Sequence, residues 1–287
     1  MNHAIAQDAV VTPAVQSPAD AQALSVRGLL RHFSTHSLRD VGEQSLMNRY
    51  DTKYLLPLKH LDEFLQRICH DYSVLEIDGR LVHGYQTEYF DTPDFSHYLA
   101  HHNNRSPRSK VRRRTYVDSG RRYLELKLKN NKGKTEKQRV PLVVGASEQD
   151  VGILLHAAPF ISLHSGESLQ PRLTIDYSRI ALWSRQHGER VSIDIGLHAT
   201  RADDAANGFN LDELVIVEVK QGAINRASPA RAALRHFMVR PLSFSKYCIA
   251  CALLYTQQLK INRFRKLLLK LRPYLAPTTK KVSHARF

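Results

Sequence analysis

Cysteine is scarce in this chain of 287 residues, which contains three: Cys69, Cys248 and Cys251. An odd and sparse set does not form the disulfide framework of a small secreted protein and is typical of a reducing compartment. The spacing of Cys248 and Cys251 resembles a redox or zinc motif, but no second pair exists and both lie in an apolar run. We therefore predict two core cysteines that lie one helical turn apart.

Long apolar runs are also missing, because no stretch approaches the ~20 residues that cross a bilayer. The first residues lack the basic start and continuous apolar run of a signal peptide. These absences predict a cytoplasmic protein. Residues 263–272 form a basic amphipathic stretch, which would suit a peripheral position at the inner membrane or a membrane-protein partner. The alternative, which we favour, is that its leucines pack on the domain.

Acidic residues are few, with 27 Asp and Glu against 42 Lys and Arg and a net charge of +15. Such an excess attracts polyanions, so nucleic acid, anionic lipid and phosphorylated small molecules are all candidate partners. Neither a P-loop nor a dinucleotide-binding glycine fingerprint is present. Three histidines, His97, His101 and His102, share an expected helix, but without a third ligand at suitable spacing we predict a solvated helix face rather than a zinc site.

From residue 49 onward, hydrophobicity alternates with period two, which is typical of strands with two different faces. The segments expected as strands are 49–56, 73–78, 85–91, 108–117, 122–130, 136–144, 172–182, 189–197 and 213–221. Those expected as helices are 29–46, 57–70, 93–103, 147–157, 229–238 and 245–271. Because strands dominate and follow one another, the order favours an α+β fold, an antiparallel sheet or barrel with peripheral helices. We predict a flexible tail over 1–28, one catalytic domain over 29–258, and a basic helix and tail over 259–287.

The polar faces of these strands carry many cations. One face of strand 108–117 holds Arg108, Lys110, Arg112 and Arg114. Similar faces carry Arg49, Asp51 and Lys53; Lys127 and Lys129; Lys137 and Arg139; Arg190, Ser192 and Asp194; Glu218 and Lys220. Neighbouring like charges repel, and a linear phosphate chain between them would relieve the repulsion through charge-assisted hydrogen bonds. One such run is usually a solvated face, but its repetition over several strands favours a shared channel.

Three carboxylates, Asp51, Glu125 and Glu218, alternate with lysines on the same strand faces. Magnesium and manganese ions prefer oxygen ligands of this kind, which would hold the metal against phosphate. The alternative is that each carboxylate pairs with a neighbouring Lys or Arg.

Eight short motifs carry a resemblance to a known family: Arg49-x-Asp51-x-Lys53-Tyr54, Tyr89-Phe90-Asp91-Thr92, Lys110-x-Arg112-x-Arg114-x-Tyr116, Leu124-Glu125-Leu126-Lys127, Tyr177-x-Arg179, Arg190-x-x-Ile193-Asp194, Glu218-x-Lys220 and Phe244-Ser245-Lys246-Tyr247. In this order, over about residues 45–256, they resemble the polyphosphate polymerase domain of the vacuolar transporter chaperone (VTC) family, within the triphosphate tunnel metalloenzymes. The resemblance implies an eight-stranded antiparallel β-barrel tunnel with peripheral helices. It also implies ATP as phosphoryl donor, Mn²⁺ or Mg²⁺ as cofactor, and polyphosphate as product.

The resemblance also assigns roles to residues. Catalytic contacts to phosphate fall on Lys53, Arg112, Arg114, Lys127, Arg179 and Arg190. Glu218 is the expected metal ligand, with Asp51 and Glu125 as secondary candidates, and Ser245 and Lys246 lie where the family contacts phosphate at the tunnel mouth. Further substrate-binding candidates are Arg49, Lys110, Lys129, Lys137, Arg139, Lys220 and Tyr177, although a packing role for Tyr177 is an equal alternative.

We predict metal-dependent phosphoryl transfer, namely polyphosphate synthesis from ATP, with triphosphate or polyphosphate as the other ligands. Hydrolysis of tripolyphosphate or a nucleoside triphosphate in the same channel is the first alternative, with Asp51 or Glu125 orienting water. The second is a non-catalytic binder of polyphosphate or RNA. An RNA-binding sheet would carry a ladder of aromatic side chains among the basic ones. Tyr116 and Tyr123 would serve, but we expect no regular ladder and hence no specific nucleic acid.

Overall fold

The computed structural model describes residues 26–41, 50–131, 135–143, 169–223, 225 and 227–277. Several predictions fall outside these residues: most of the tail over 1–28, Arg49, the helix over 147–157, and the chain beyond residue 277. The bounds of the strands are β1 (Ser34–His36), β2 (Tyr50–Pro57), β3 (Ser73–Leu75), β4 (His83–Asp91), β5 (Arg108–Tyr116), β6 (Arg122–Lys129), β7 (Thr135–Leu142), β8 (Gln170–Ser184), β9 (Glu189–Arg201), β10 (Gly208–Leu211), β11 (Leu214–Gln221) and β12 (Ala276–Pro277).

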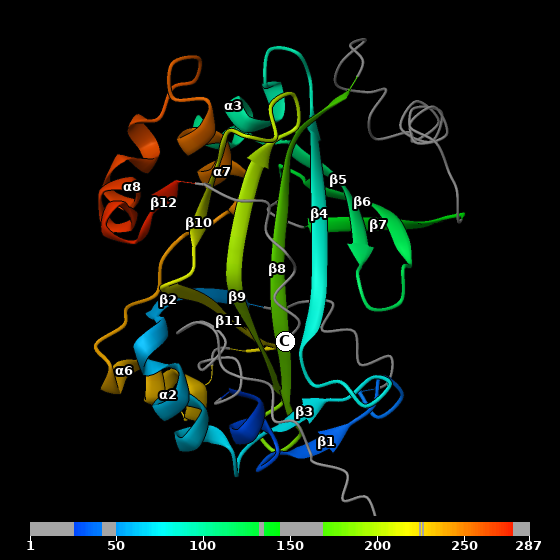
Figure 1. Cartoon of the computed structure of the whole chain (residues 1–287), viewed down its shortest axis with the longest axis vertical. Helices are drawn as coiled ribbons and strands as arrows, with labels where there is room; N and C mark the ends of the chain where they lie inside the picture. The colour runs from blue at the N-terminus through cyan, green and yellow to red at the C-terminus, as the bar shows by residue number, and fades with distance from the viewer. Residues whose placement is uncertain are drawn as a thin grey trace, which may run out of the picture.

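Eight of these strands follow one antiparallel path, in the order β2, β11, β9, β8, β4, β5, β6 and β7 (Figure 1). Shorter strands extend it: β10 and β12 beside β9, and β3 beside β8, with β1 parallel to β3. The predicted eight-stranded antiparallel architecture is confirmed. Hydrogen bonds do not close it into a complete barrel, because β2 and β7 end the path and do not pair with each other within the described ranges.

Helices gather at the two ends of the sheet (Figure 1). Near β1 and β3 lie α2 (Leu61–Ile68), which follows the short helix η1 (Leu58–His60), and α6 (Pro229–His236). At the other end lie α3 (Ser96–His102), α7 (Lys246–Leu254) and α8 (Arg265–Leu271), with η2 (Asn262–Phe264) and η3 (Arg272–Tyr274) flanking α8. Within the described residues, no helix combines the length and apolar character needed to cross a bilayer.

Two hydrophobic clusters occupy opposite faces of the sheet. Successive side chains of a strand point to opposite sides, and in β11 Val217 packs in the cluster with α2 and α6, whereas Ile216 packs in the cluster with α7. Cys248 and Cys251 are fully buried in the second cluster, which confirms their prediction as core residues. Glu218 lies two positions after Ile216 in β11, so its side chain points to the same face of the sheet as the α7 cluster.

Two predicted helices were wrong in extent. The segment expected as a helix over 29–46 is helical at 26–30 and then forms β1, which pairs with β3. The long helix over 245–271 is broken after α7. A straight helix of that length would span about 40 Å, whereas Phe264 and Leu271 both turn back into the α7 cluster. In both places, burial against the rest of the domain overrides the local helical pattern. The leucines of 263–272 pack on the domain, which is the alternative that we favoured.

The predicted solvated histidine face was also wrong. His97 and His102 are buried in α3, and His101 is half-buried. The cause is Asp91 at the end of β4, whose buried carboxylate accepts hydrogen bonds from the backbone N–H groups of His97 and Tyr98 at 2.9 Å. This anchoring holds α3 against α7.

Candidate functional site

One face of the eight-stranded path gathers most of the predicted site residues. Directly opposed residues of antiparallel strands point to the same side, so the register carries this face from Lys53 and Glu218 across β9, β8 and β4 to Arg112 and Arg114. We call it the cationic face and define it by Asp51, Lys53, Glu218, Lys220, Arg190, Asp194, Arg179, Tyr177, Lys110, Arg112, Arg114, Glu125, Lys127, Lys129, Lys137 and Arg139.

The sheet curls around this face. Lys53 on β2 donates to the carbonyl oxygen of Phe244 at 2.8 Å, and Lys110 on β5 donates to Oγ of the adjacent Ser245 at 2.7 Å. Strands β2 and β5 are five steps apart along the path, about 24 Å in a flat sheet at ~4.8 Å per strand. Two lysines so far apart cannot reach adjacent residues unless the strands bend toward each other, so the face is concave.

Repulsion among the gathered lysines shows in their pKa values. Burial, together with Lys246, Lys110 and Lys220, lowers the pKa of Lys53 despite the nearby Glu218. Lys127 keeps part of its surface exposed, yet desolvation by the surrounding protein and the charges of Lys110, Lys137 and Lys53 lower its pKa to about 8. Lys53 therefore acts electrostatically on a residue near the opposite end of the strand path. An anion at this face would relieve the repulsion.

Asp194 is a counter-ion whose role the sequence did not reveal. Its carboxylate, 3% exposed, accepts hydrogen bonds from Arg179 Nε at 2.5 Å and Nη2 at 2.8 Å, and it also pairs with Lys246. Burial opposes ionisation of Asp194, but Arg179 and Lys246 outweigh it and lower its pKa. Lys246 opens α7, whose N-cap is Ser245. This ion group ties α7 to β8 and β9 at the centre of the cationic face.

Glu218 lies between two lysines, with Oε2 2.7 Å from Lys220 Nζ and Oε1 3.8 Å from Lys53 Nζ. Burial opposes its ionisation, but Lys220 and Lys53 hold its pKa well below the usual value. In the described ranges, no three His, Cys, Asp or Glu side chains come together as a metal site. Magnesium commonly binds through one or two carboxylates plus substrate phosphates. An ionised Glu218 fits that arrangement only when phosphate oxygens supply the remaining ligands.

Glu125 pairs with arginines, which is the alternative that we left open for the three carboxylates. Its Oε2 lies 2.6 Å from Arg112 Nη2 and 3.6 Å from Arg114 Nη1, and its Oε1 lies 3.7 Å from Arg139 Nε. The buried Nε of Arg114 has no hydrogen-bond partner in the described part of the chain. Because a buried unsatisfied donor is costly, this atom suits a ligand oxygen at the cationic face.

Tyr177 is both packed and polar. It is buried, its ring stacks on Tyr85 with centroids 5.3 Å apart, and its hydroxyl accepts from Arg114 Nη2 at 3.4 Å. Burial opposes ionisation of Tyr177, but Arg179, Arg114 and Lys246 outweigh it and lower its pKa to about 8. The hydroxyl therefore faces the same cations that would meet phosphate.

An aromatic ladder crosses the cationic face, contrary to our expectation. It consists of Tyr177, Tyr85, Tyr116 and Tyr123, with successive centroids 5.3, 5.1 and 5.8 Å apart. Sequence spacing did not reveal it because the rings lie on β8, β4, β5 and β6, which only the register brings together. The sequence did contain one indication of the ladder: Tyr85 is spaced two and four residues from Thr87 and Tyr89, so the three side chains point to the same side of one strand.

The remaining predicted residues lie toward the edges of the face. Lys137 and Arg139 on β7, and Asp51 on β2, are exposed, whereas Lys129 and Arg190 are half-buried. Arg190 lies opposite Lys220 in the register, and Asp51 lies on the other side of Lys220. The cationic face is thus partly buried over β2, β11, β9, β8 and β5 and opens toward β7.

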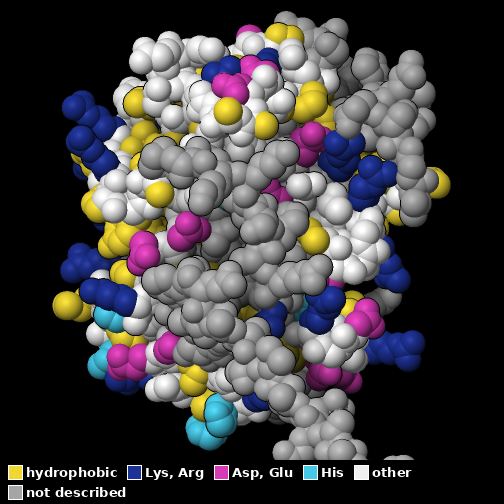
Figure 2. Space-filling view, in the orientation of Figure 1, with side chains coloured by type: hydrophobic (Ala, Val, Ile, Leu, Met, Phe, Trp, Pro, Cys, Tyr) yellow, Lys and Arg dark blue, Asp and Glu magenta, His cyan; other side chains and the backbone are white. Residues whose placement is uncertain are grey.

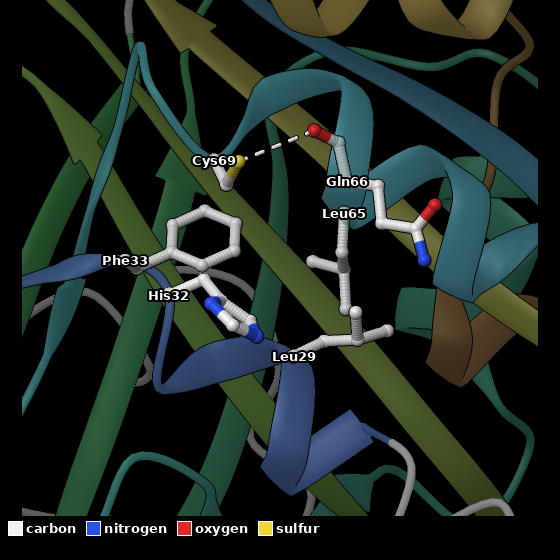
Figure 3. A pocket seen from close by; sticks show the side chains of 6 residues that line it. All are labelled: Leu29, His32, Phe33, Leu65, Gln66 and Cys69. Atoms are coloured by element: carbon white, nitrogen blue, oxygen red, sulfur yellow. Dashed lines mark hydrogen bonds between the residues drawn. The ribbon is translucent and has the colours of Figure 1, made fainter.

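Elsewhere the surface differs in character. In the described part of the view in Figure 2, Lys and Arg are interspersed with Asp and Glu rather than gathered in one patch. The pocket in Figure 3, about 200 Å³, lies at α2 and is lined by Leu29, His32, Phe33, Leu65, Gln66 and Cys69. Phe33 and Leu65 belong to the cluster on the opposite face of the sheet, and the lining has no Lys or Arg, so this pocket does not suit phosphate.

Comparison with solved structures finds several chains of similar fold. The chain is similar in structure to a protein from Hippeastrum described as having a dominant triphosphatase activity, with 16% identity and a TM-score of 0.42 over 70% of this chain and 94% of that chain. It is also similar to a candidate adenylate cyclase from Vibrio parahaemolyticus, with 12% identity and a TM-score of 0.41 over 70% and 96%. A third structure, from Pyrococcus horikoshii, has 12% identity and a TM-score of 0.40 over 78% and 98%.

No match is found among the curated proteins. The sequence model of the VTC domain matches residues 48–255, a range that runs from just before β2 to the end of α7. This range contains every residue of the cationic face. The chain belongs to the VTC domain family.

Proposed function

We propose that the cationic face binds a chain of phosphates and transfers a phosphoryl group from ATP to growing polyphosphate. The observation that supports this most strongly is the gathering of cations from seven strands and α7, with too few carboxylates among the described residues to balance them. Lysines with lowered pKa values, and an Arg114 Nε that has no hydrogen-bond partner among the described residues, both indicate a face that is incomplete without an anion. A linear phosphate chain offers oxygens along its whole length.

In the proposed reaction, Arg179, Arg114 and Lys246 surround the phosphate that is transferred, and the Tyr177 hydroxyl donates a hydrogen bond to a phosphate oxygen. Phosphoryl transfer depends mainly on positioning and on stabilising negative charge, so these fixed cations supply what the transition state requires. Lys53, Lys110 and Ser245 meet on the 244–245 segment and hold the neighbouring phosphates in line.

A divalent ion, Mn²⁺ or Mg²⁺, would neutralise charge on phosphate oxygens beside Glu218. The residues fit this role because Glu218 stays ionised, while Lys53 and Lys220 lie close enough to hold the same phosphates. Asp51 lies diagonally across the register from Glu218 on the same face, so it is the better of the two secondary candidates. Glu125 is less suited because three arginines surround it.

Hydrolysis of tripolyphosphate or a nucleoside triphosphate uses the same face, with water as the acceptor. Within the described ranges, the carboxylates at the centre of the cationic face, Glu125, Glu218 and Asp194, all pair with cations, so none of them is available to orient a water molecule. This observation favours a phosphate acceptor, which the cations would hold, over an activated water.

The test is an incubation of the purified protein with ATP and Mn²⁺, followed by separation of the products on a gel. Long phosphate chains identify a polymerase, phosphate and ADP without chains identify a hydrolase, and unchanged ATP refutes both. Glu218→Gln should abolish metal-dependent turnover while triphosphate still binds in calorimetry. Retained turnover in this variant would remove Glu218 from the metal site.

A further inference from the structure

The outer end of the aromatic ladder has a different character from its inner end. Tyr177 is buried at the centre of the cationic face, whereas Tyr116 and Tyr123 are half-buried near β7. Arg139 covers them, with its guanidinium carbon 3.5 Å from the Tyr123 centroid and 5.3 Å from the Tyr116 centroid. Arginines lie over the rings at both ends of the ladder, but those at the inner end are largely buried, whereas the outer end is open to solvent.

Arg139 is held in one orientation. Its Nη2 donates to the Tyr116 hydroxyl at 2.9 Å, its Nε faces Glu125 at 3.7 Å, and one side of its plane lies on Tyr123. Even so, 47% of the side chain is exposed. Two of its three nitrogens are already engaged, which leaves it poorly placed as a bidentate phosphate ligand. A fixed guanidinium plane is instead a good surface for stacking an aromatic ring.

The distance from the centre of the face also suits a nucleotide. Tyr123 on β6 lies three strands from Tyr177 on β8, about 14 Å along the sheet at ~4.8 Å per strand. An extended nucleoside triphosphate with its terminal phosphate at Arg179 and Arg114 reaches this far with its base.

We propose that Arg139, with the Tyr123 and Tyr116 rings beside it, forms a stacking site for the base of a nucleoside triphosphate. This site selects nucleotides over inorganic triphosphate as phosphoryl donors. The inference rests on the proposed function, since it requires the triphosphate to lie on the cationic face. Stacking on aromatic rings and arginine is tolerant of base identity, so ATP and GTP bind with similar affinity.

The experiment compares ATP with inorganic triphosphate in calorimetry without added metal, so that binding alone is measured. Replacing both Tyr116 and Tyr123 with Leu should weaken ATP binding about tenfold or more, because stacking contributes ~1–3 kcal/mol per base. Affinity for inorganic triphosphate should not change. The matched control replaces both residues with Phe, which keeps both rings and loses the hydrogen bond from Arg139 to the Tyr116 hydroxyl, so it should retain more of the ATP affinity than the Leu variant.

Arg139→Lys separates stacking from phosphate binding, because lysine keeps the charge and loses the plane. We expect the affinity for ATP to fall several-fold more than the affinity for inorganic triphosphate. Equal losses for both ligands would identify Arg139 as a phosphate ligand and overturn the stacking site, as would unchanged ATP binding in the Leu variant. Failure of inorganic triphosphate to bind the wild-type protein would instead refute the proposed function, and this inference with it.

Discussion

Asp194→Asn removes the buried counter-ion of two half-buried cations and tests how the cationic face is held together. Arg179 and Lys246 lie against a carboxylate that is 3% exposed, and removal of one member of a buried ion pair costs about 3–5 kcal/mol. For a domain of this size each kcal/mol lowers the melting temperature by about 2–4 °C, so the variant should melt about 6–20 °C lower.

The matched control is Asp203→Asn. Asp203 also holds an arginine through two hydrogen bonds, at 2.8 and 2.6 Å from Arg201, but its side chain is 59% exposed. Exposed pairs contribute about 0–1 kcal/mol, so this variant should melt close to the wild type.

Melting curves recorded with inorganic triphosphate complete the test. In Asp194→Asn, Arg179 and Lys246 are released from their carboxylate, so at equal concentration triphosphate should raise the melting temperature more than in the wild type. Equal destabilisation by the two Asp replacements, or no larger ligand effect in Asp194→Asn, would refute the idea that Asp194 balances the charges that phosphate meets.

Two further predictions concern pH and the fold. The pKa of Lys127 is lowered to about 8, so the free protein loses a cation as pH rises through this value, and its affinity for triphosphate should fall by up to about tenfold per pH unit. Lys127→Arg keeps its charge, so its affinity, measured by calorimetry, should decline less steeply with pH. Equal slopes for the two proteins would contradict the role of Lys127. Ser228 is the N-cap of α6: its hydroxyl accepts a hydrogen bond from the backbone N–H of Arg231 at 3.2 Å and donates one to Glu189 at 2.9 Å. Ser228→Ala should therefore lower the free energy of unfolding, measured in urea, by about 1–2 kcal/mol. Ser228→Thr retains the hydroxyl, so its free energy of unfolding should fall less.

The strands were predictable because alternation is a local property. Strands β2, β5, β6, β7 and β11 begin and end within a few residues of the predicted bounds. In β6 and β11 an aliphatic face, which must be buried, alternates with a charged face, which cannot be buried alone. The positions of the cations within each strand followed directly, so the candidate residues could be named before the strands were placed.

The sequence alone therefore determined the strand type, the excess of cations and the parity that puts Lys53, Arg112 and Arg114 on polar faces. Tertiary structure decided which side chains meet, because contacts such as Lys246 with Asp194 or Tyr85 with Tyr177 join segments remote in the chain. It also decided where helices stop, since Phe264 and Leu271 gain more from burial beside α7 than a continuous helix could supply. Register and curvature are global quantities, and no short stretch of residues specifies them.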